Sequence, residues 1–373
     1  MLEKGKKLLF ICEYKSLYGG NFIPSLIALE EELSKYGISC VYAFPKEAER
    51  REWVLFLKSE GKSITFFDFK LSAVNFISEL EKLVKEKQIS YVYSHFAPIV
   101  KIELFAKKHR EIKVFIHIHS DFSAGKSSFK NNIKTFLMYK LFASEVVFFS
   151  VSKAFVYYNP KKINYVPNGI ATKRIGCKHM GGRAIRKKYC IEDGDILCEI
   201  FGWAPIVKGV DVAVNAVKYL NENLDRSIKL AIVCGREMTI ERMKEWVNKN
   251  TDCSGDEEYL IYWEPQEDVF SYHEAADILL SASRSEGFPY SILEMLSIGK
   301  RCVVSDIPGV AWTRKYENVF WFATENVQEC GRSLCEAINY EDTINKDTIK
   351  AINKDYSIKN WTNRIIDGIN TNS

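Results

Sequence analysis

The chain has 373 residues, of which 47% are hydrophobic and 27% are charged, and its formal net charge is +4. This length exceeds one ordinary core and suits two domains, and the composition excludes disorder over a large part of the chain. Because Lys and Arg are spread along the sequence, the charge pattern argues against a dedicated nucleic-acid binder.

The first apolar run covers residues 7–12 and is closed by Glu13 and Lys15. It is too short for the core of a signal peptide, and no apolar run approaches the length of a transmembrane helix. The 10 cysteines include no Cys-x-x-Cys pair, so we expect reduced, mostly buried thiols in a cytoplasmic protein. Cys177 and His179 lack a second pair of ligands, so we expect no metal there.

The first half of the chain alternates strand-like and helix-like segments, which indicates a parallel sheet with helices on both faces. We expect strands at 7–12, 39–44, 64–67, 91–93, 114–118 and 145–151, and helices at 23–36 and 74–86. Residues 163–170 are expected to form a last strand that ends in a turn. Residues 173–188 are expected to connect two domains, with Gly181 and Gly182 adding flexibility.

The alternation then starts again, which predicts a second doubly wound unit. We expect strands at 196–202, 229–234, 259–263, 278–281, 302–305 and 319–322, and helices at 210–220, 269–276, 290–298 and 357–369. The predicted domains are 1–172 and 173–355, followed by a C-terminal helix in 356–373. Ligands of such sheets bind in a crevice at the carboxyl ends of the strands.

Two glutamates, Glu286 and Glu294, are separated by seven residues where a loop leads into the helix 290–298. A helix start offers backbone N–H groups and a positive dipole end, which suit a phosphate. Glu294 is placed to reach ribose hydroxyls, and Glu286 to reach sugar hydroxyls. The alternative is a surface loop with an acidic residue that merely favours the helix.

The segment 285–299 resembles the Glu-x7-Glu motif of the retaining GT-B glycosyltransferases of family GT4. Further segments resemble that family in the same order: the glycine loop 18–22, the Pro-Asn-Gly segment 165–170, the strand and Lys-Gly loop 201–211, and the flanking elements 275–279 and 303–306. The resemblance implies two Rossmann-like domains facing across a cleft. The N-terminal domain would bind the acceptor, the second domain the donor, and the C-terminal helix would cross back to the first domain.

The resemblance also implies roles for single residues. Glu294 would bind the ribose of the donor, and Glu286 the donor sugar as a catalytic residue. Lys208 and the backbone N–H groups around Tyr290 and Ser291 would hold the diphosphate, and Gly19 and Gly20 would let the first loop approach it closely. Phe288 and Pro289 complete the predicted donor-binding residues. A fixed lysine also suits the negative charge that develops on a leaving diphosphate. The alternative for Lys208 is a solvated loop lysine.

One residue departs from the family pattern: Trp203 stands where the family usually has an arginine that faces the phosphate. Lys208 would then act alone, or Arg284 or Arg236 would substitute. Among the histidines, His119 fits the family position that faces the donor sugar, and we predict that it is catalytic.

Two other histidines lie near His119 in the sequence. His117 is expected to be a buried strand residue on the same face, because side chains alternate along a strand. His95 ends the preceding strand and is a candidate for the acceptor side.

The resemblance implies a retaining hexosyltransferase that uses a nucleotide diphosphate sugar, with UDP favoured, and a glycan or lipid-linked glycan acceptor. It implies no metal or cofactor. Residues 126–141 interleave lysines with apolar residues, which suits peripheral contact with the inner membrane face or an ordinary solvated helix. The alternatives to a transferase are a non-catalytic GT-B subunit and a sugar-nucleotide epimerase. A dehydrogenase is disfavoured, because no strand is followed by Gly-x-Gly-x-x-Gly.

Overall fold

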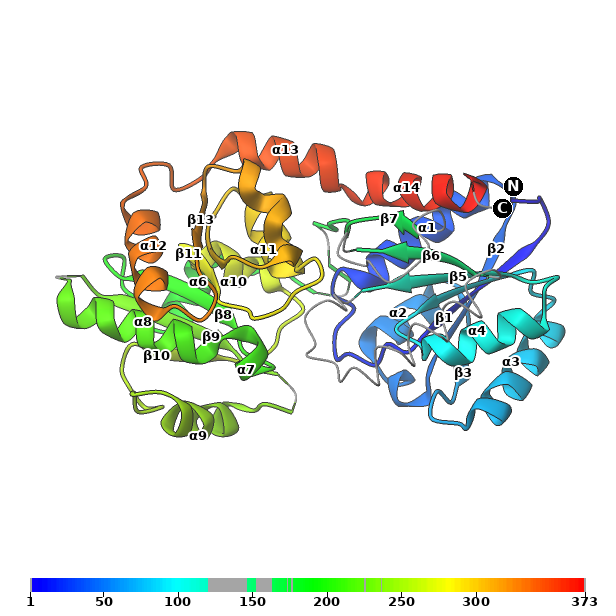
Figure 1. The fold of residues 1–373 in the computed structure, drawn as a ribbon, viewed down its shortest axis with the longest axis horizontal. Coiled ribbons are helices and arrows are strands. Elements are labelled where there is room, and N and C mark those ends of the chain that lie inside the picture. The colour runs from blue at the N-terminus through cyan, green and yellow to red at the C-terminus, as the bar shows by residue number, and fades with distance from the viewer. Residues whose placement is uncertain are drawn as a thin grey trace. The chain divides into compact units, whose positions relative to one another are not determined.

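The computed structural model describes residues 2–119, 146–151, 163–172, 174–175, 177–224, 226–235 and 237–371. The chain divides into two compact units (Figure 1). The first unit comprises Met1–Gly176 and Tyr356–Ser373, and the second comprises Cys177–Asp355. Each unit contains one parallel sheet.

The first unit contains a seven-stranded sheet in the order β3-β2-β1-β4-β5-β6-β7. Its strands are β1 (Lys7–Cys12), β2 (Ser39–Pro45), β3 (Ser63–Phe67), β4 (Tyr91–His95), β5 (Lys113–Ile118), β6 (Val146–Ser150) and β7 (Ile163–Tyr165). Its helices are α1 (Phe22–Lys35), the 3₁₀ turn η1 (Lys46–Ala48), α2 (Glu52–Ser59), α3 (Ala73–Lys87), α4 (Ile99–Lys108) and α14 (Ile358–Thr371).

Both faces of this sheet are buried. Successive side chains of a strand point to opposite faces, so Phe10 of β1 packs with α1, α2 and α14, whereas Leu9 and Ile11 pack with α3 and α4. This two-sided burial explains why the strands of the sequence are continuous apolar runs rather than alternating ones.

The second unit contains a six-stranded sheet in the order β10-β9-β8-β11-β12-β13. Its strands are β8 (Ile196–Phe201), β9 (Ile228–Val233), β10 (Leu260–Trp263), β11 (Ile278–Ser281), β12 (Arg301–Ser305) and β13 (Val319–Phe322). Its helices are α6 (Gly182–Lys188), α7 (Pro205–Lys208), α8 (Val210–Asn223), α9 (Ile240–Asn250), α10 (Val269–Ala275), α11 (Tyr290–Ser297), the 3₁₀ helix η4 (Pro308–Lys315), α12 (Val327–Asn339) and α13 (Lys346–Tyr356).

The predicted fold class, two doubly wound parallel sheets, is confirmed. The ends of the predicted strands and helices agree with the structure to within three residues, with one exception. Residues 163–170 form a strand only over Ile163–Tyr165. The segment 126–141, proposed to contact a membrane, lies outside the described residues. In the described part of the chain, no helix has the length and apolar character needed to cross a bilayer.

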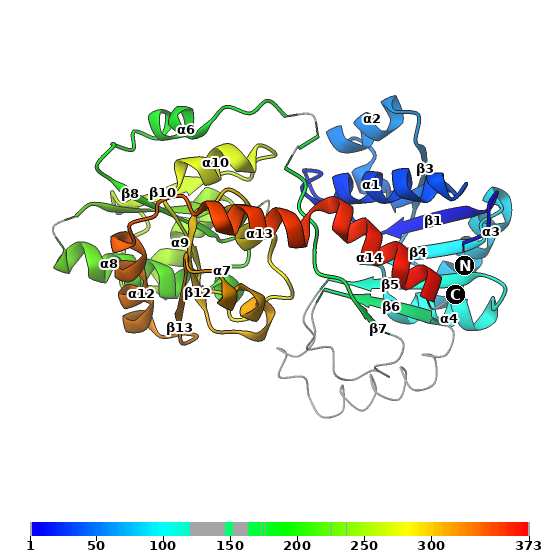
Figure 2. The same cartoon turned by 90° about the horizontal axis from the view of Figure 1, so that it is seen from above.

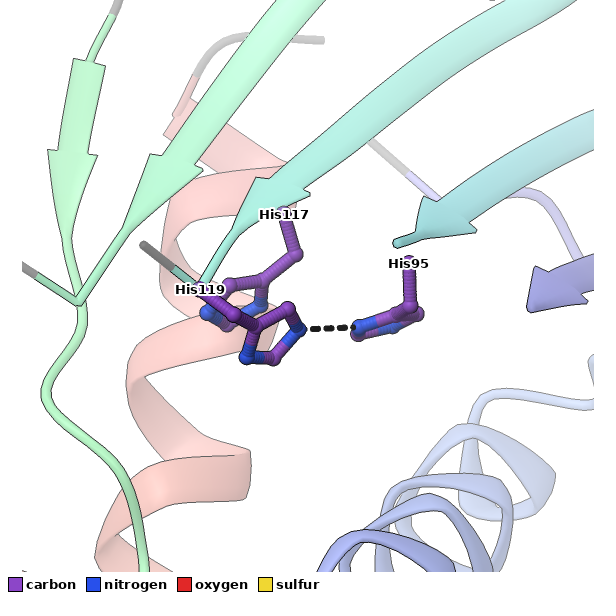
Figure 3. Close-up of side chains that lie close together, drawn as sticks. All are labelled: His95, His117 and His119. Atoms are coloured by element: carbon purple, nitrogen blue, oxygen red, sulfur yellow. Dashed lines mark hydrogen bonds between the residues drawn. The ribbon is translucent and has the colours of Figure 1, made fainter. Parts of the chain in front are cut away.

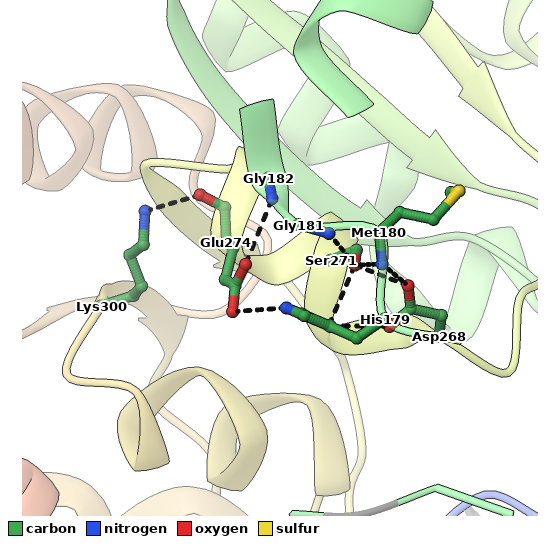
Figure 4. Close-up of polar contacts among 8 residues, drawn as sticks. All are labelled: His179, Met180, Gly181, Gly182, Asp268, Ser271, Glu274 and Lys300. Atoms are coloured by element: carbon green, nitrogen blue, oxygen red, sulfur yellow. Dashed lines mark hydrogen bonds and ion pairs between the residues drawn. The ribbon is translucent and has the colours of Figure 1, made fainter. Parts of the chain in front are cut away.

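The prediction of a flexible connection through Gly181 and Gly182 is wrong for its last part, because Gly182–Lys188 form α6. The backbone N–H groups of Met180 and Gly181 donate to Ser271 Oγ at 3.0 and 2.7 Å. Figure 4 shows that His179 completes this attachment, with Nδ1 3.2 Å from Asp268 Oδ1 and Nε2 3.2 Å from Glu274 Oε1.

The two glycines in this connection are required for fit rather than for flexibility. Gly181 has a φ of +83°, which favours glycine. A Cβ at Gly182 would lie 2.6 Å from the backbone carbonyl carbon of Glu274, so α6 approaches α10 too closely for any side chain there. The connection is thus fixed to α10 from His179 onward.

The C-terminal helix α14 completes the core of the first unit. It lies beside α1 (Figure 2), and Trp361 is only 4% exposed in the same cluster as Leu29 of α1. Gly169 of the Pro-Asn-Gly segment allows this packing, because a Cβ there would lie 2.6 Å from Trp361 Cβ. The N–H of Ile170 donates to the carbonyl of Tyr356 at 2.8 Å.

We therefore expect Trp361→Ala to destabilise the first unit by about 3–5 kcal/mol, the usual cost of truncating a buried tryptophan. Urea unfolding, with hydrogen exchange of β1 and α1 as a local readout, measures this. The matched control is Trp203→Ala, because that side chain is 57% exposed and its loss should change stability by about 0.5 kcal/mol or less. Equal effects of the two substitutions would show that α14 is not part of the core.

Candidate functional site

In the second unit, the order of the strands reverses between β8 and β11. Strands β9 and β10 follow β8 outward in one direction, and β12 and β13 follow β11 in the other. Ligands of doubly wound sheets bind outside the carboxyl ends of the strands at such a point. A hollow of about 210 Å³, counting space open to solvent, lies there and is lined by Ile200, Phe201, Lys208, Leu279, Leu280, Ser281, Ser283, Glu286 and Ser291.

A lysine and a glutamate meet at this hollow. Lys208 Nζ lies 2.5 Å from Glu286 Oε1, and Ser283 Oγ donates to the same oxygen at 2.7 Å. Both charged side chains are 12% exposed. The structure thus brings together two residues that are 78 positions apart, and it leaves a fixed cation and a carboxylate at the carboxyl ends of the strands.

Glycines fix both partners of this pair. Gly209 has a φ of +66°, and a Cβ there would lie 2.0 Å from the carbonyl oxygen of Ala282. The Lys-Gly turn therefore packs directly on the backbone that leaves β11. A Cβ at Gly309 would lie 1.8 Å from the carbonyl oxygen of Glu286, so η4 supports the loop that carries Glu286 with no room for a side chain.

The predicted donor-binding residues 288–291 have different environments. Phe288 is 4% exposed and stacks on Trp312 with ring centroids 4.4 Å apart, so it packs beneath the loop. Pro289 is the N-cap of α11, and Tyr290 is its first residue. Ser291, in the first turn of α11, lines the hollow. The first turn of a helix carries partial positive charge, so the hollow has a second source of attraction for an anion beside Lys208.

Glu294, one turn further along α11, is not among the residues that line the hollow and is 5% exposed. Its Oε2 lies 3.1 Å from His273 Nε2. The other nitrogen, His273 Nδ1, forms a short contact with Glu199 Oε1 of β8. The histidine and Glu199 are fully buried, so a buried Glu-His-Glu chain holds the carboxylate of Glu294.

The Glu199–His273–Glu294 hydrogen-bond chain holds a positive charge in the core of the second unit. Burial alone would lower the pKa of His273, but the charges and hydrogen bonds of Glu199 and Glu294 outweigh burial and raise the pKa to about 9. At neutral pH the imidazolium therefore lies between two carboxylates. Its hydrogen bonds fix the orientation of the Glu294 side chain.

Sequence reasoning missed His273, Glu199 and Ser283. A signal existed for Glu199, because it is a lone acidic residue inside an otherwise apolar buried strand, and a buried carboxylate requires a partner. No comparable signal marked His273 or Ser283.

The suggested substitutes for the missing arginine are not confirmed. Arg284 forms ion pairs with Asp211 and Glu325, both at 2.7 Å, and Arg236 lies outside the described residues. Lys208 Nζ lies 5.1 Å from the centroid of the Trp203 ring. The Trp203 ring thus lies beside Lys208, whereas an arginine at this position would have added a second positive charge.

In the first unit, three histidines gather at the carboxyl ends of β4 and β5 (Figure 3). His117 lies on the same face of the sheet as His119, as predicted, and is 2% exposed. His95 is fully buried, and His119 is partly exposed. Burial, together with the neighbouring His119, holds the pKa of His95 and His117 well below the usual value, and burial lowers the pKa of His119 to about 3. The three imidazoles are therefore neutral at pH 7.

The predicted glycine loop lies after β1 in the same unit. Gly20 has a φ of +54°, and Gly19 is buried against Ile23 and Trp53. The hydroxyl of Tyr14 donates to the carbonyl of Tyr18 at 2.9 Å and closes the loop. The positive φ explains Gly20, whereas a Cβ at Gly19 would lie 3.4 Å from the Cβ atoms of Ile23 and Trp53, which is an ordinary contact. The predicted approach of both glycines to a phosphate stays a prediction.

Comparisons with known proteins agree with this geometry. Residues 200–339, less than half of the chain, match the family model "Glycosyl transferases group 1". A curated relative, the UDP-Gal:alpha-D-GlcNAc-diphosphoundecaprenol alpha-1,3-galactosyltransferase of Escherichia coli, is 24% identical over 243 residues. That match covers 62% of this chain and 61% of the relative, which is less than two thirds of its length.

Solved structures resemble the whole chain. HepE of Anabaena in complex with UDP-glucose superimposes with a TM-score of 0.76 and 13% identity, over 98% of this chain and 99% of that one. A glycosyltransferase from Rickettsia africae gives a TM-score of 0.75 and 16% identity, over 98% of each chain. The two doubly wound units therefore constitute a GT-B fold, and residues 200–339 within it match the glycosyl transferases group 1 model.

Proposed function

We propose that the protein is a retaining glycosyltransferase that moves a hexose from a UDP-sugar to a glycan or lipid-linked glycan. The observation that carries this proposal is the Lys208–Glu286 pair in the hollow at the switch point of the second unit. The curated relative, named for transfer of galactose to a diphosphoundecaprenol-linked sugar, supports both the donor and the acceptor class. The UDP-glucose complex of HepE supports the donor.

Each group of the hollow suits one part of such a donor. Lys208 and the first turn of α11, with Tyr290 and Ser291, would hold the diphosphate. Glu286 would accept hydrogen bonds from the sugar hydroxyls, and Glu294, oriented by His273, would accept them from the ribose. Binding would replace the direct Lys208–Glu286 contact, because the lysine would turn to the diphosphate and the carboxylate to the sugar.

The transfer needs a site for negative charge and a site for one proton. The bond between the anomeric carbon and the diphosphate oxygen breaks, and UDP leaves with the electron pair. The acceptor oxygen bonds to the same face of that carbon, and its proton passes to the departing phosphate. Lys208 stabilises the charge on the leaving group, which is the usual role of a fixed cation in such a site.

Other parts of the proposal concern the surroundings of the reaction. His119 would contact the transferred sugar, and no metal or cofactor takes part in the transfer. We place the enzyme in the cytoplasm, where contact of residues 126–141 with an anionic membrane would bring it to a lipid-linked acceptor.

A second candidate is a non-catalytic GT-B subunit, which the exposed Trp203 in place of a cationic residue favours. Such a subunit would bind a nucleotide or a partner without releasing UDP from a sugar donor. Donor turnover therefore separates the two candidates.

Nucleotide-dependent thermal stabilisation tests the donor site. At about a hundred times its dissociation constant, a ligand stabilises a fold by roughly 2.7 kcal/mol, which corresponds to a rise in Tm of about 5–10 °C for a unit of this size. We expect this rise with UDP and UDP-hexoses but not with GDP. Glu294→Gln, which retains a hydrogen-bond acceptor for His273, should reduce it.

The matched control is Asp306→Asn, which removes a carboxylate that is 53% exposed and pairs with Arg314. This variant should keep the full rise in Tm. No stabilisation by any nucleotide sugar, or an equal rise in Glu294→Gln, would refute the assigned donor site.

A further inference from the structure

The three histidines of the first unit form a cluster that the proposed transfer does not require. One ring nitrogen of each residue lies within 4.8 Å of the corresponding nitrogens of the other two. His95 ends β4, His117 lies in β5, and His119 follows β5 directly. Figure 3 shows that all three rings turn toward one another on one side of these strand ends.

Two nitrogens of the cluster are buried without a hydrogen-bond partner. Among the described residues, neither His95 Nε2 nor His117 Nε2 has a donor or acceptor within reach. A buried polar atom without a partner is costly, and such atoms commonly mark the place of a water or an ion. His117 Nε2 is thus a candidate ligand atom, whereas on His95 the nitrogen that faces the cluster is Nδ1.

The remaining nitrogens are arranged as in a histidine metal site. Tyr93 Oη lies 2.9 Å from His117 Nδ1, and when Nδ1 carries the proton, Nε2 presents its lone pair. A hydrogen bond on the second nitrogen of this kind orients metal-binding histidines. His95 Nδ1 and His119 Nε2 lie 2.9 Å apart, so one of them donates its proton to the other. A cation bound by both nitrogens would take the place of that proton, which would move to the second nitrogen of the same ring.

The backbone beside the cluster is also held in an uncommon conformation. Phe96, which follows His95, has a φ of +59° although it is bulky. Its ring stacks on His119 with centroids 4.3 Å apart. Such strained residues gather at functional sites, because the surrounding structure must maintain them.

We propose that His95, His117 and His119 bind one divalent transition-metal ion of the Zn²⁺ class. The chemistry favours this class because, within the part of the chain that the structure describes, the cluster offers imidazole nitrogens and no carboxylate, whereas Mg²⁺ and Ca²⁺ require oxygen ligands. Three histidines with a fourth position for water are an established zinc arrangement. The partly exposed His119 marks the side from which water and the ion enter.

The three histidine rings need to move only a short distance to reach the geometry of a zinc site. Zn–N distances of about 2.0–2.1 Å in a tetrahedral site separate the ligand nitrogens by about 3.3 Å. The His95–His119 pair at 2.9 Å is already near that separation, and the widest pair needs to approach by about 1.5 Å. Rotation of the partly exposed His119 ring provides part of this approach.

The test uses the untagged full-length protein after treatment with a chelator. Titration with Zn²⁺ against a chromophoric chelator should show one tight site, and His95→Gln, His117→Gln and His119→Gln should each weaken it by at least about 100-fold. Tyr93→Phe, which removes only the partner of His117, should weaken it by about 10-fold or more. Co²⁺ bound to the wild-type protein should give the visible absorption of a tetrahedral nitrogen site.

The matched controls are His109→Gln and His179→Gln. Both histidines lie at the surface beside two carboxylates and would hold an adventitious ion. Loss of Zn²⁺ binding in either control with retention in the three cluster variants would overturn the proposal, as would the absence of a tight site in the wild type. The Co²⁺ spectrum decides the matter if a cluster variant fails to fold.

This proposal does not rest on the proposed transfer, because Zn²⁺ binding is measured without nucleotide. Failure of UDP to stabilise the second unit would leave the zinc result unaffected, and the reverse also holds. The ion and the transferred sugar would exclude each other at the His119 imidazole, so the bound ion takes no part in the proposed transfer.

Discussion

Lys208→Ala is expected to lower the rate of UDP release from a UDP-hexose by about 10²–10³-fold, the usual cost of removing one fixed group that stabilises developing charge. The lysine is positioned before any ligand arrives, because Gly209 fixes the turn that carries it and Glu286 and the Trp203 ring fix its ammonium group. The rate is measured by a coupled assay for UDP, with and without acceptor.

The chain offers a closely matched control in Lys244→Ala. Lys244 Nζ lies 2.7 Å from Asp256 Oδ1 and 5.6 Å from the centroid of the Tyr262 ring. It therefore repeats the ion pair and aromatic contact of Lys208 in the same unit but away from the hollow. Its loss should leave UDP release unchanged. An equally active Lys208→Ala protein would show that the pair at the hollow is structural.

The second large effect is expected from His273→Gln, which removes the buried cation between Glu199 and Glu294. Breaking a buried ion pair by removing one partner costs about 3–5 kcal/mol, because a buried carboxylate is left without compensation. The second unit should therefore lose stability at neutral pH. Urea unfolding, with hydrogen exchange of β8 and α10, measures the loss.

The pH dependence gives a readout that a simple packing defect would not produce. The folded pKa of His273, about 9, lies above its unfolded value of about 6.5. The folded state therefore binds more protons between these values, and the stability from His273 is fully present below about pH 6.5 and lost as the pH rises through about 9. That contribution is about 3 kcal/mol.

The wild type should therefore lose urea resistance between pH 6.5 and 9, whereas His273→Gln should show a flatter profile. His179→Gln serves as the control, because His179 also lies between two carboxylates but its side chain is 53% exposed. Screening by solvent should make its effect small. A wild-type profile as flat as that of His273→Gln would mean that the buried histidine is neutral when folded.

The elements that the sequence predicted share one property: strong apolar periodicity or a continuous apolar run. Strands β1, β11 and β13 were predicted with the residues that the structure has, because each is a compact, largely buried apolar run. Among the described elements, those that were missed are the helices α2, α4, α6, α9, α12 and α13 and the short pieces α7, η1 and η4. In α9 only Met243 and Val247 are buried, so the pattern gives little signal.

Only those residues of the candidate site that lie within one short segment of the sequence could be predicted. Glu286 and Ser291 lie on one loop and helix start, and the adjacent Lys-Gly pair at 208–209 is itself a turn signal. The hydrogen bond between Glu294 and His273, and the contact from His273 to Glu199, join three elements of the fold. Such contacts depend on the order of strands in the sheet, which a single sequence does not specify.

The first unit is formed from two separate stretches of the chain, and this affects how it folds during synthesis. This unit lacks α14 until residues 358–371 have been synthesised, although its sheet is complete at Tyr165. Domains usually fold as they emerge, the N-terminal one first. Here the ribosome must first add residues 177–355, which takes about 10–35 s at about 5–20 residues per second. During that time the face of the first sheet that receives Trp361 lacks its cover, and the second, contiguous unit is the first that can finish folding.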